Sequence, residues 1–211
     1  MAKGMLLTAL DSSARTSAAL ADELDATPDG RGQRDSTALR ADSGIESPHG
    51  DGRQTWGTAA LRHSLAAYAT GVTLVAAQVD GRPAGMLANS FTSVSLDPPL
   101  VSVAMGRHSP TLARLRRAPR WGISVLDEQQ QALFGQLARP APERFAGIDA
   151  LSGDDGSLLL PGAAATFIVS PQDELAAGDH LIVVLRVLAH ERDTGRAPLI
   201  FHGSRLHTLQ G

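Results

Sequence analysis

Three short stretches of the sequence combine residue types that could hold and use a small ligand. The first runs from Gly85 to Val101, where small and hydroxyl-bearing residues crowd a segment that otherwise has the pattern of β-strands. Small side chains let a flat ligand approach the backbone, whose N–H groups and neighbouring hydroxyls can bond to ring oxygens and nitrogens. A Ser/Thr-rich edge strand facing water has the same composition, so both interpretations stay open.

The second stretch, Arg107 to Thr111, lies directly before an expected short helix. Ser109 is suited to the N-cap position and Pro110 to the first helical position. A helix N-terminus offers N–H donors and the positive end of the helix dipole, which can hold a phosphate, and Arg107 and Arg114 could add charge. A capped helix with nothing bound fits the same residues.

The third stretch, Ala177 to His180, precedes an apolar strand. Gly178-Asp179 is typical of a tight turn, which would place His180 at the beginning of that strand. A histidine there could donate to an amide or help to position a proton or hydride donor. A purely structural histidine at a strand end is the alternative.

The composition excludes several kinds of chemistry. The 211-residue chain has no cysteine, which removes disulfides, thiolate nucleophiles and cysteine-based metal sites. Its one lysine is Lys3, so neither a Schiff-base nor a phosphate-loop lysine is expected. The histidines show no ligand spacing, and we predict no metal site. A net charge of -3 argues against a nucleic-acid partner.

Membrane association and secretion are also not expected. No apolar run approaches the length of a membrane-spanning helix, which is about 18 residues. The N-terminal residues lack the long apolar region and cleavage site of a secretory signal. The sequence therefore predicts a cytoplasmic protein with no membrane partner.

The chain divides into a tail and one domain. From Ala26 to Gln54 the only large apolar residues are Leu39 and Ile45, so this stretch cannot bury enough area to offset the entropy of ordering it. We predict that residues 1–54 form a disordered N-terminal tail. Residues 55–211 form the domain that must position the three stretches.

Apolar spacing within the domain predicts many short strands and few helices. Helices are expected over Thr58 to Ala69, Thr111 to Arg117 and Glu128 to Ala138. Strands are expected over Val72 to Val79, Gly85 to Ser95 with a bend, Leu100 to Met105, Trp121 to Leu126, Ala165 to Ser170, His180 to His190 and Leu199 to Phe201. Asp80-Gly81 is a hairpin signal. Because strands and helices do not alternate, the pattern favours a mainly β, antiparallel barrel over a parallel sheet.

At these residues the chain resembles the flavin reductase-like family, the FMN-binding split barrels that act as reductase partners of two-component flavin monooxygenases. The matching segments are Tyr68 to Thr73, Gly85 to Val101, Ala177 to His180 and Pro198 to Phe201. The resemblance implies an antiparallel Greek-key split β-barrel and a homodimer with the flavin near the subunit interface. It also implies hydride transfer from NADH or NADPH to FMN or FAD, with nicotinamide C4 stacked against flavin N5, after which reduced flavin diffuses to the oxygenase.

The resemblance further implies roles for individual residues. The isoalloxazine ring and ribityl chain would be lined by Ala88, Asn89, Ser90, Phe91, Ser93 and Val94. The flavin phosphate would be held by His108, Ser109, Thr111 and Arg114. The nicotinamide nucleotide would contact His180, Arg205 and His207, and His180 is the expected catalytic residue.

Three positions depart from the family pattern. Leu87 stands where a hydroxyl residue is usual, Ser124 replaces a common Asn, and Leu206 replaces a usual aromatic near the nicotinamide end. Two other functions therefore remain as alternatives: a split-barrel enzyme that acts on another small molecule, and a non-catalytic flavin-binding or interaction module. The sequence does not distinguish FMN from FAD or NADH from NADPH.

Overall fold

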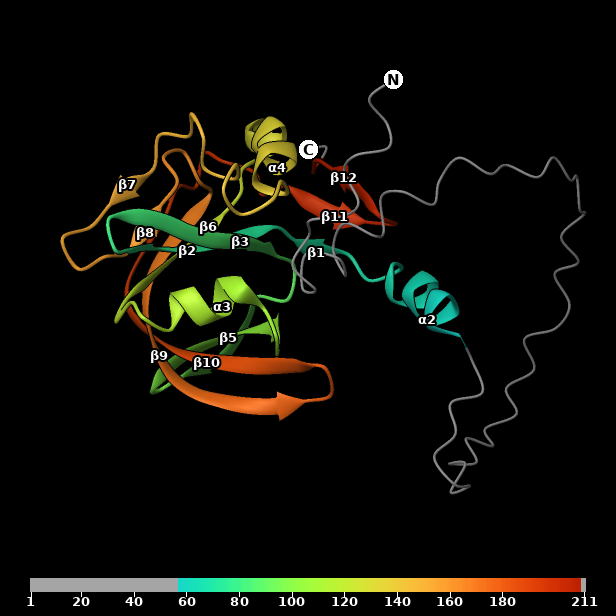
Figure 1. Cartoon of the computed structure of the whole chain (residues 1–211). Coiled ribbons are helices and arrows are strands. Elements are labelled where there is room, and N and C mark those ends of the chain that lie inside the picture. Colours follow the sequence, from blue (N-terminus) through green and yellow to red (C-terminus); the bar gives the residue numbers. More distant parts are fainter. Residues whose placement is uncertain (1–56, 210–211) are drawn as a thin grey trace, which may run out of the picture.

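The computed structural model describes residues 57–209, and the tail predicted over residues 1–54 lies outside them (Figure 1). The helices are α2 (Thr58–Leu65), α3 (Pro110–Leu115) and α4 (Gln131–Leu137), with a 3-10 turn, η1 (Glu128–Gln130), before α4. The strands are β1 (Thr70–Gly71), β2 (Thr73–Val79), β3 (Arg82–Ala88), β4 (Thr92–Leu96), β5 (Pro99–Gly106), β6 (Trp121–Val125), β7 (Leu151–Ser152), β8 (Leu158–Leu159), β9 (Ala165–Ala177), β10 (His180–Arg192), β11 (Ile200–His202) and β12 (Arg205–His207). None of the described helices is long and apolar enough to cross a membrane.

Seven of these strands form one antiparallel sheet in the order β3-β2-β6-β9-β10-β5-β4. A smaller sheet contains β1, β11 and β12, and β7 pairs with β8. The sheet curves around one apolar core, and α3 lies against β2 and β3 (Figure 1). The predicted mainly β, antiparallel fold is confirmed.

β2 is buried on both faces because it lies between two apolar clusters. Val75 and Ala77 face the core inside the curved sheet, whereas Leu74 and Ala76 face an outer cluster that α4 covers. Alternate residues of a strand point to opposite faces, so a strand buried on both sides has a continuous apolar run. This explains the apolar sequence of this strand.

The β2–β3 hairpin confirms the turn predicted at Asp80-Gly81. Asp80 has a φ of 52° and Gly81 a φ of 72°, the two positive values that a type I′ turn requires. Beyond the turn, Val79 pairs with Arg82 and Thr73 with Ala88, which fixes the register of β3 up to its last residue.

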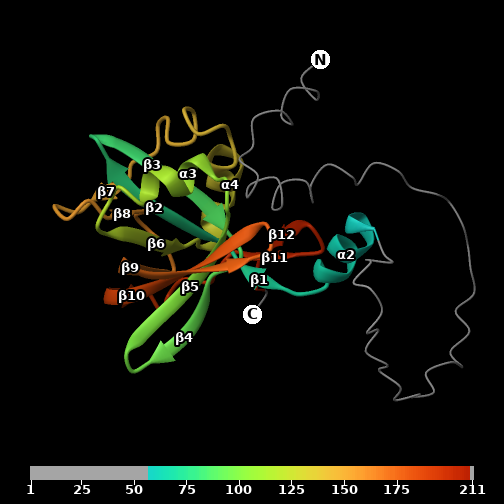
Figure 2. The ribbon, with the colours of Figure 1, turned by 60° about the horizontal axis from the view of Figure 1, so that its bottom comes forward.

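The prediction of one bent strand over Gly85 to Ser95 was wrong. This segment contains the end of β3 and most of β4, which lie at opposite edges of the seven-stranded sheet. β3 pairs with β2, whereas β4 pairs with β5 in a hairpin that projects from one side of the molecule (Figure 2). The three residues Asn89 to Phe91, which we call the connector, therefore pass from one sheet edge to the other.

The β9–β10 hairpin is longer than the sequence indicated. Predicted to end at Ser170, β9 continues to Ala177, and its polar second half stays in register with β10. A register shift at Pro171 accommodates this residue, since proline within a sheet is tolerated at bulges and edges. The turn of this hairpin consequently lies beside the end of β5, where His180 pairs with Gly106.

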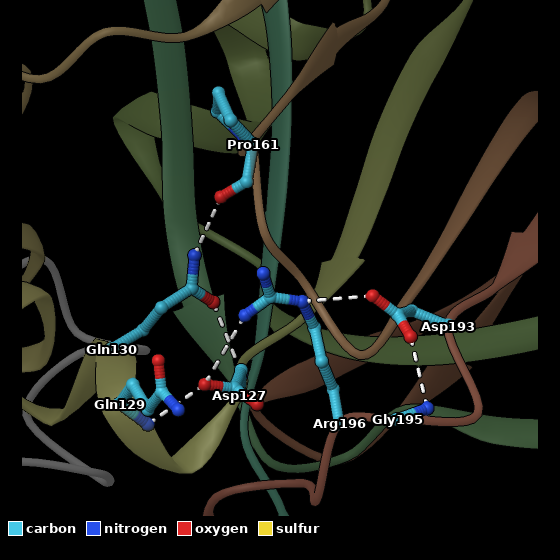
Figure 3. A network of polar contacts seen from close by, with 7 residues as sticks. All are labelled: Asp127, Gln129, Gln130, Pro161, Asp193, Gly195 and Arg196. Atoms are coloured by element: carbon cyan, nitrogen blue, oxygen red, sulfur yellow. Dashed lines mark hydrogen bonds and ion pairs between the residues drawn. The ribbon is translucent and has the colours of Figure 1, made fainter.

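A polar network centred on the buried Asp127 lies at the opposite ends of β9 and β10 (Figure 3). Asp127, which is 1% exposed, accepts a hydrogen bond from Gln129 N at 2.8 Å and faces the guanidinium of Arg196 at 3.7 Å. Gln130 donates to Pro161 O at 2.8 Å, and Arg196 Nε donates to Asp193 at 3.0 Å. The network joins the end of β6 to the loops before β9 and after β10.

α2 lies apart from the sheets (Figure 1). It contains no buried residue, and Leu65 and Tyr68 are 61% and 77% exposed. The helix expected over Thr58 to Ala69 ends at Leu65, and its two leucines, Leu61 and Leu65, are both exposed. Its last turn is held by Ala66 O, which accepts a bond from Gly203 N.

Candidate functional site

The three stretches that the sequence analysis selected meet at the carboxyl end of β5. The Ser90 hydroxyl bonds to the main chain of Ala104. Two residues further along β5, Gly106 pairs with His180 of β10. Gly106 O also accepts a hydrogen bond from Ser109 N at 3.0 Å, at the beginning of α3. Segments that are far apart in the sequence are thus brought together by the last three residues of one strand.

The connector contributes small and half-buried residues to this site. Ala88 is buried at the end of β3, and its carbonyl accepts a hydrogen bond from Thr73 Oγ1 at 2.9 Å. Asn89 and Ser90 are half-buried. The ring of Phe91 packs against Phe167, with ring centroids 5.4 Å apart, and so belongs to the core.

Ser93 and Val94 lie on β4, the exposed edge strand. Ser93 pairs with Val101, and Val94 occupies a register shift, where it is 52% exposed. Farther along β4, Leu96 is 90% exposed. The strand thus presents both polar and large apolar side chains to its surroundings.

The N-terminus of α3 has the predicted cap. Ser109 is the N-cap, Pro110 follows it in the first turn, and Ser109 Oγ accepts a hydrogen bond from Leu112 N at 3.1 Å. His108 is exposed beside it, whereas Ser109 is 3% exposed. Arg107 N donates to Asp179 O at 2.9 Å, which holds the β9–β10 turn against this loop.

Thr111 and Arg114, also predicted at the phosphate, make hydrogen bonds elsewhere. The Thr111 hydroxyl is buried and accepts a hydrogen bond from Arg144 at 3.4 Å. Arg114 donates to Pro83 O at 3.3 Å and lines a hollow of about 770 Å³ with Phe145 and neighbouring residues. Of the four predicted phosphate ligands, the structure groups His108 and Ser109 together.

His180 lies at the beginning of β10, as predicted, and forms a pair with Asp179. Its Nδ1 lies 2.7 Å from Asp179 Oδ1. This hydrogen bond, together with the attraction of the imidazole, lowers the pKa of the Asp179 carboxyl below its ordinary value. The paired carboxylate orients the imidazole ring of His180, whose side chain is 23% exposed.

Arg205 and His207 are not brought to this site within the described chain. Both lie on β12, in the three-stranded sheet, where His207 Nε2 is 3.1 Å from His202 O. Figure 1 shows this hairpin and the β9–β10 turn well apart. Among residues 57–209, no group of three or more histidine and acidic side chains is arranged to hold a metal ion.

The three positions that depart from the family pattern are structural. Leu87 and Leu206 both pack against the outer apolar cluster, although they are distant in sequence. Ser124 is fully buried, and its Oγ accepts a hydrogen bond from Leu160 N at 3.0 Å. Each of these side chains therefore has a place in the packing of this chain.

Sequence reasoning missed Arg144, which is 2% exposed and contacts α3 through Thr111. Its guanidinium donates to Gly85 O and to Arg139 O, in addition to Thr111. A buried arginine that bonds to main-chain carbonyls holds segments in place, and nothing in its local sequence distinguishes it from a surface arginine. Ala104 was missed for a similar reason, since its role depends on its main chain.

Comparison with known proteins identifies the architecture. Residues 65–210 match the flavin reductase like domain family. This chain belongs to the flavin reductase-like family. The resemblance predicted from the sequence motifs is confirmed, as is the split-barrel fold that it implied.

Three relatives illustrate the similarity of this flavin reductase-like chain. It is 46% identical over 133 residues to the probable flavin reductase of Rhizobium meliloti, an alignment that covers 63% of this chain and 43% of that protein. It is 33% identical over 142 residues to the flavin-dependent monooxygenase, reductase subunit HsaB, of Rhodococcus jostii, covering 67% of this chain and 73% of that protein. The solved structure of the Streptomyces globisporus NADH:FAD oxidoreductase SgcE6, in complex with NAD and FAD fragments, is 33% identical with a TM-score of 0.67, covering 71% and 91% of the two chains. The chain thus spans less than half the length of the first of these relatives.

Proposed function

We propose that this protein is a flavin reductase, which uses NADH or NADPH to reduce FMN or FAD and supplies the reduced flavin to a partner monooxygenase. The observation that carries the proposal is the convergence of the connector, the N-terminus of α3 and the Asp179–His180 pair at the end of β5. The names of the relatives support the same activity, since one is a monooxygenase reductase subunit and another an NADH:FAD oxidoreductase.

The residues at the end of β5 suit a flavin in shape and in chemistry. Ala88 ends β3 with a side chain small enough for a planar ring to approach the main chain. Asn89 adds an amide that can donate and accept. His108 offers an imidazole that can bond to a phosphate group, and the N-terminus of α3 beside it adds the positive end of the helix dipole. A flavin, with its planar ring and charged tail, matches this combination.

The chain itself would bind and orient the two reactants. A bound flavin supplies the group that accepts a hydride, and this chemistry belongs to the cofactor. The connector and β4 would hold the ring, and His108 and Ser109 would lie at the phosphate. His180, oriented by Asp179, would contact the nicotinamide nucleotide and keep its donor carbon directed toward the ring.

We include a homodimer in the proposal. Large apolar side chains are exposed in the single chain, among them Leu65 at the end of α2, Tyr68 just after it and Leu96 on β4. Large exposed apolar surfaces on a single chain mark sites of interaction with another molecule. A second copy of the chain would cover them, and could bring its Arg205 and His207 toward the flavin site. A cytoplasmic location completes the proposal, because the nicotinamide nucleotide and the oxygenase must both be accessible.

A turnover assay tests the proposal. The purified full-length protein is mixed with NADH and either FMN or FAD, and the NADH absorbance band is followed; NADPH is then used in place of NADH. Flavin-dependent oxidation supports a reductase. Flavin binding without turnover would favour a binding module, and the lack of any flavin binding would point to another small molecule.

The His180→Ala variant refines the same assay. We expect this variant to slow hydride transfer more than it weakens flavin binding, because His180 is assigned to the nicotinamide nucleotide. An equal loss of both would make His180 a structural residue and remove it from the proposed site.

A further inference from the structure

The hydroxyl of Ser90 makes two hydrogen bonds to a single residue of β5. Ser90 Oγ donates to Ala104 O at 3.1 Å, and Ala104 N donates to Ser90 Oγ at 3.0 Å. A serine hydroxyl has one proton to donate. Because that proton is given to Ala104 O, the hydroxyl cannot at the same time donate to an oxygen or nitrogen of a ligand.

These two bonds replace a main-chain pairing that is missing at the end of the β4–β5 ladder. Thr92 pairs with Ser102, and the same register continued by two residues would set Ser90 opposite Ala104. β4 begins only at Thr92, so no strand main chain is present there to pair with Ala104. The Ser90 hydroxyl supplies the acceptor and the donor that a paired strand would supply, and so satisfies both main-chain groups of Ala104.

The connector is consequently fixed to β5 through a side chain. Its main chain does not continue the ladder and is turned out of the sheet at the point where β3 and β4 diverge. The residues on either side are also held, since Ala88 O accepts from Thr73 and the Phe91 ring packs on Phe167. Ser90 is the middle contact of the three.

We infer that Ser90 is a positioning residue, whose hydroxyl holds the connector on β5 so that the main chain of the connector is presented to the flavin. This inference rests on the proposed function and revises the direct flavin contact that the resemblance implied for Ser90. Both bonds to Ala104 lie within the chain and involve no ligand atom.

Amide hydrogen exchange at Ala104 tests the inference without flavin. In the flavin-free wild type we expect the Ala104 amide to be protected, and in Ser90→Ala we expect its exchange to be faster by about tenfold or more, as loss of a hydrogen bond predicts. Ser90→Thr, which keeps the hydroxyl, should restore protection. Ser95→Ala, on β4 where it pairs with Leu100 and lies away from the connector, is the matched control and should leave Ala104 unchanged.

Flavin titration supplies the second measurement. Ser90→Ala should weaken flavin binding by about tenfold and lower the thermal midpoint, since both main-chain groups of Ala104 lose their partner, and Ser90→Thr should recover most of both. Weaker flavin binding with unchanged Ala104 exchange would show a direct contact and overturn the inference. An Ala104 amide that is unprotected in the wild type would also overturn the inference. This measurement needs only the wild-type protein and is decisive even if Ser90→Ala fails to fold.

The two measurements separate this inference from the proposed function. A wild-type protein that binds no flavin would contradict the proposed function, and would also remove the flavin from the role assigned to Ser90. Exchange at Ala104 would still decide whether the hydroxyl holds the connector on β5.

Discussion

His180 Nδ1 donates a hydrogen bond to Asp179 Oδ1 across 2.7 Å, at the turn that lies against the N-terminus of α3. A carboxylate can only accept, so this contact fixes the proton on Nδ1 and leaves Nε2 as the other interacting atom of the ring. The pairing gives His180 one orientation at the proposed flavin site.

Replacing Asp179 by asparagine should slow the nicotinamide step selectively. The amide oxygen of Asp179→Asn still accepts from His180, but the bond is no longer charge-assisted, a difference of about 1 kcal/mol or fivefold in rate. Single-turnover reduction of bound flavin by NADH measures this step. Flavin affinity should change by less than about twofold, and a parallel fall in affinity would argue that the pair only supports the fold.

The ion pair between Arg116 and Glu174 should contribute to stability above acidic pH. Arg116 Nε donates to Glu174 at 2.8 Å, and this hydrogen bond is the main reason why the pKa of the Glu174 carboxyl is lowered. Because the pKa of Glu174 is lower in the folded state than in the unfolded state, the stabilisation is present above the unfolded-state pKa and is lost as the pH falls through the folded-state pKa.

Urea unfolding of Glu174→Gln checks this expectation. Since both side chains are partly exposed, the loss at pH 7 should be modest, about 0.5 to 1 kcal/mol, and should vanish in strong acid. Glu191→Gln on the same hairpin is the control and should change little. A loss that persists undiminished at low pH would exclude the ion pair as its cause.

Gly122 should not tolerate a side chain. A Cβ atom at this position of β6 would lie 2.2 Å from Leu158 O, a main-chain atom of β8. We expect Gly122→Ala to lower the free energy of unfolding by about 1 to 3 kcal/mol through displacement of β8. Gly135→Ala in α4, where a Cβ meets nothing within 4 Å, should be neutral or stabilising. Thermal unfolding of the two variants compares them directly, and similar midpoints would contradict this packing.

Leu65 of α2 should matter for assembly, whereas Leu151 should not. Both side chains are 61% exposed, but Leu151 lies on β7, on the opposite side of the molecule (Figure 1). If α2 is covered by a second copy, Leu65→Asp should shift the protein toward a monomer in light scattering, and Leu151→Asp should leave it dimeric. A monomeric wild type would refute the homodimer, and a Leu65→Asp variant that stays dimeric would show that the second copy does not cover α2.

Local chemistry made much of the fold predictable. Asp80-Gly81 indicated its own turn because few residue pairs accept two positive φ values. Ser109-Pro110 likewise indicated the beginning of α3. The apolar run of β2 reflects burial on both faces, which is readable from its composition.

Long-range pairing was not predictable in the same way. The composition of Gly85 to Ser95 is compatible with a single strand. This segment is divided at the connector because β3 pairs with β2 whereas β4 pairs with β5. The polar half of β9 became a strand because β10 pairs with it. The direction of the Arg114 side chain, toward Pro83, depends on how α3 lies on the sheet.

Flavin titration of Ser109→Asp beside Ser109→Asn tests the central claim, that the end of β5 and the N-terminus of α3 hold a flavin. Both replacements can cap α3, so the two variants differ mainly in one negative charge. The account predicts saturable binding of one flavin per wild-type chain and affinity for FMN or FAD at least about tenfold weaker in Ser109→Asp than in Ser109→Asn, because a carboxylate repels the phosphate. Equal affinities in the two variants, or no flavin binding by the wild type, would contradict it.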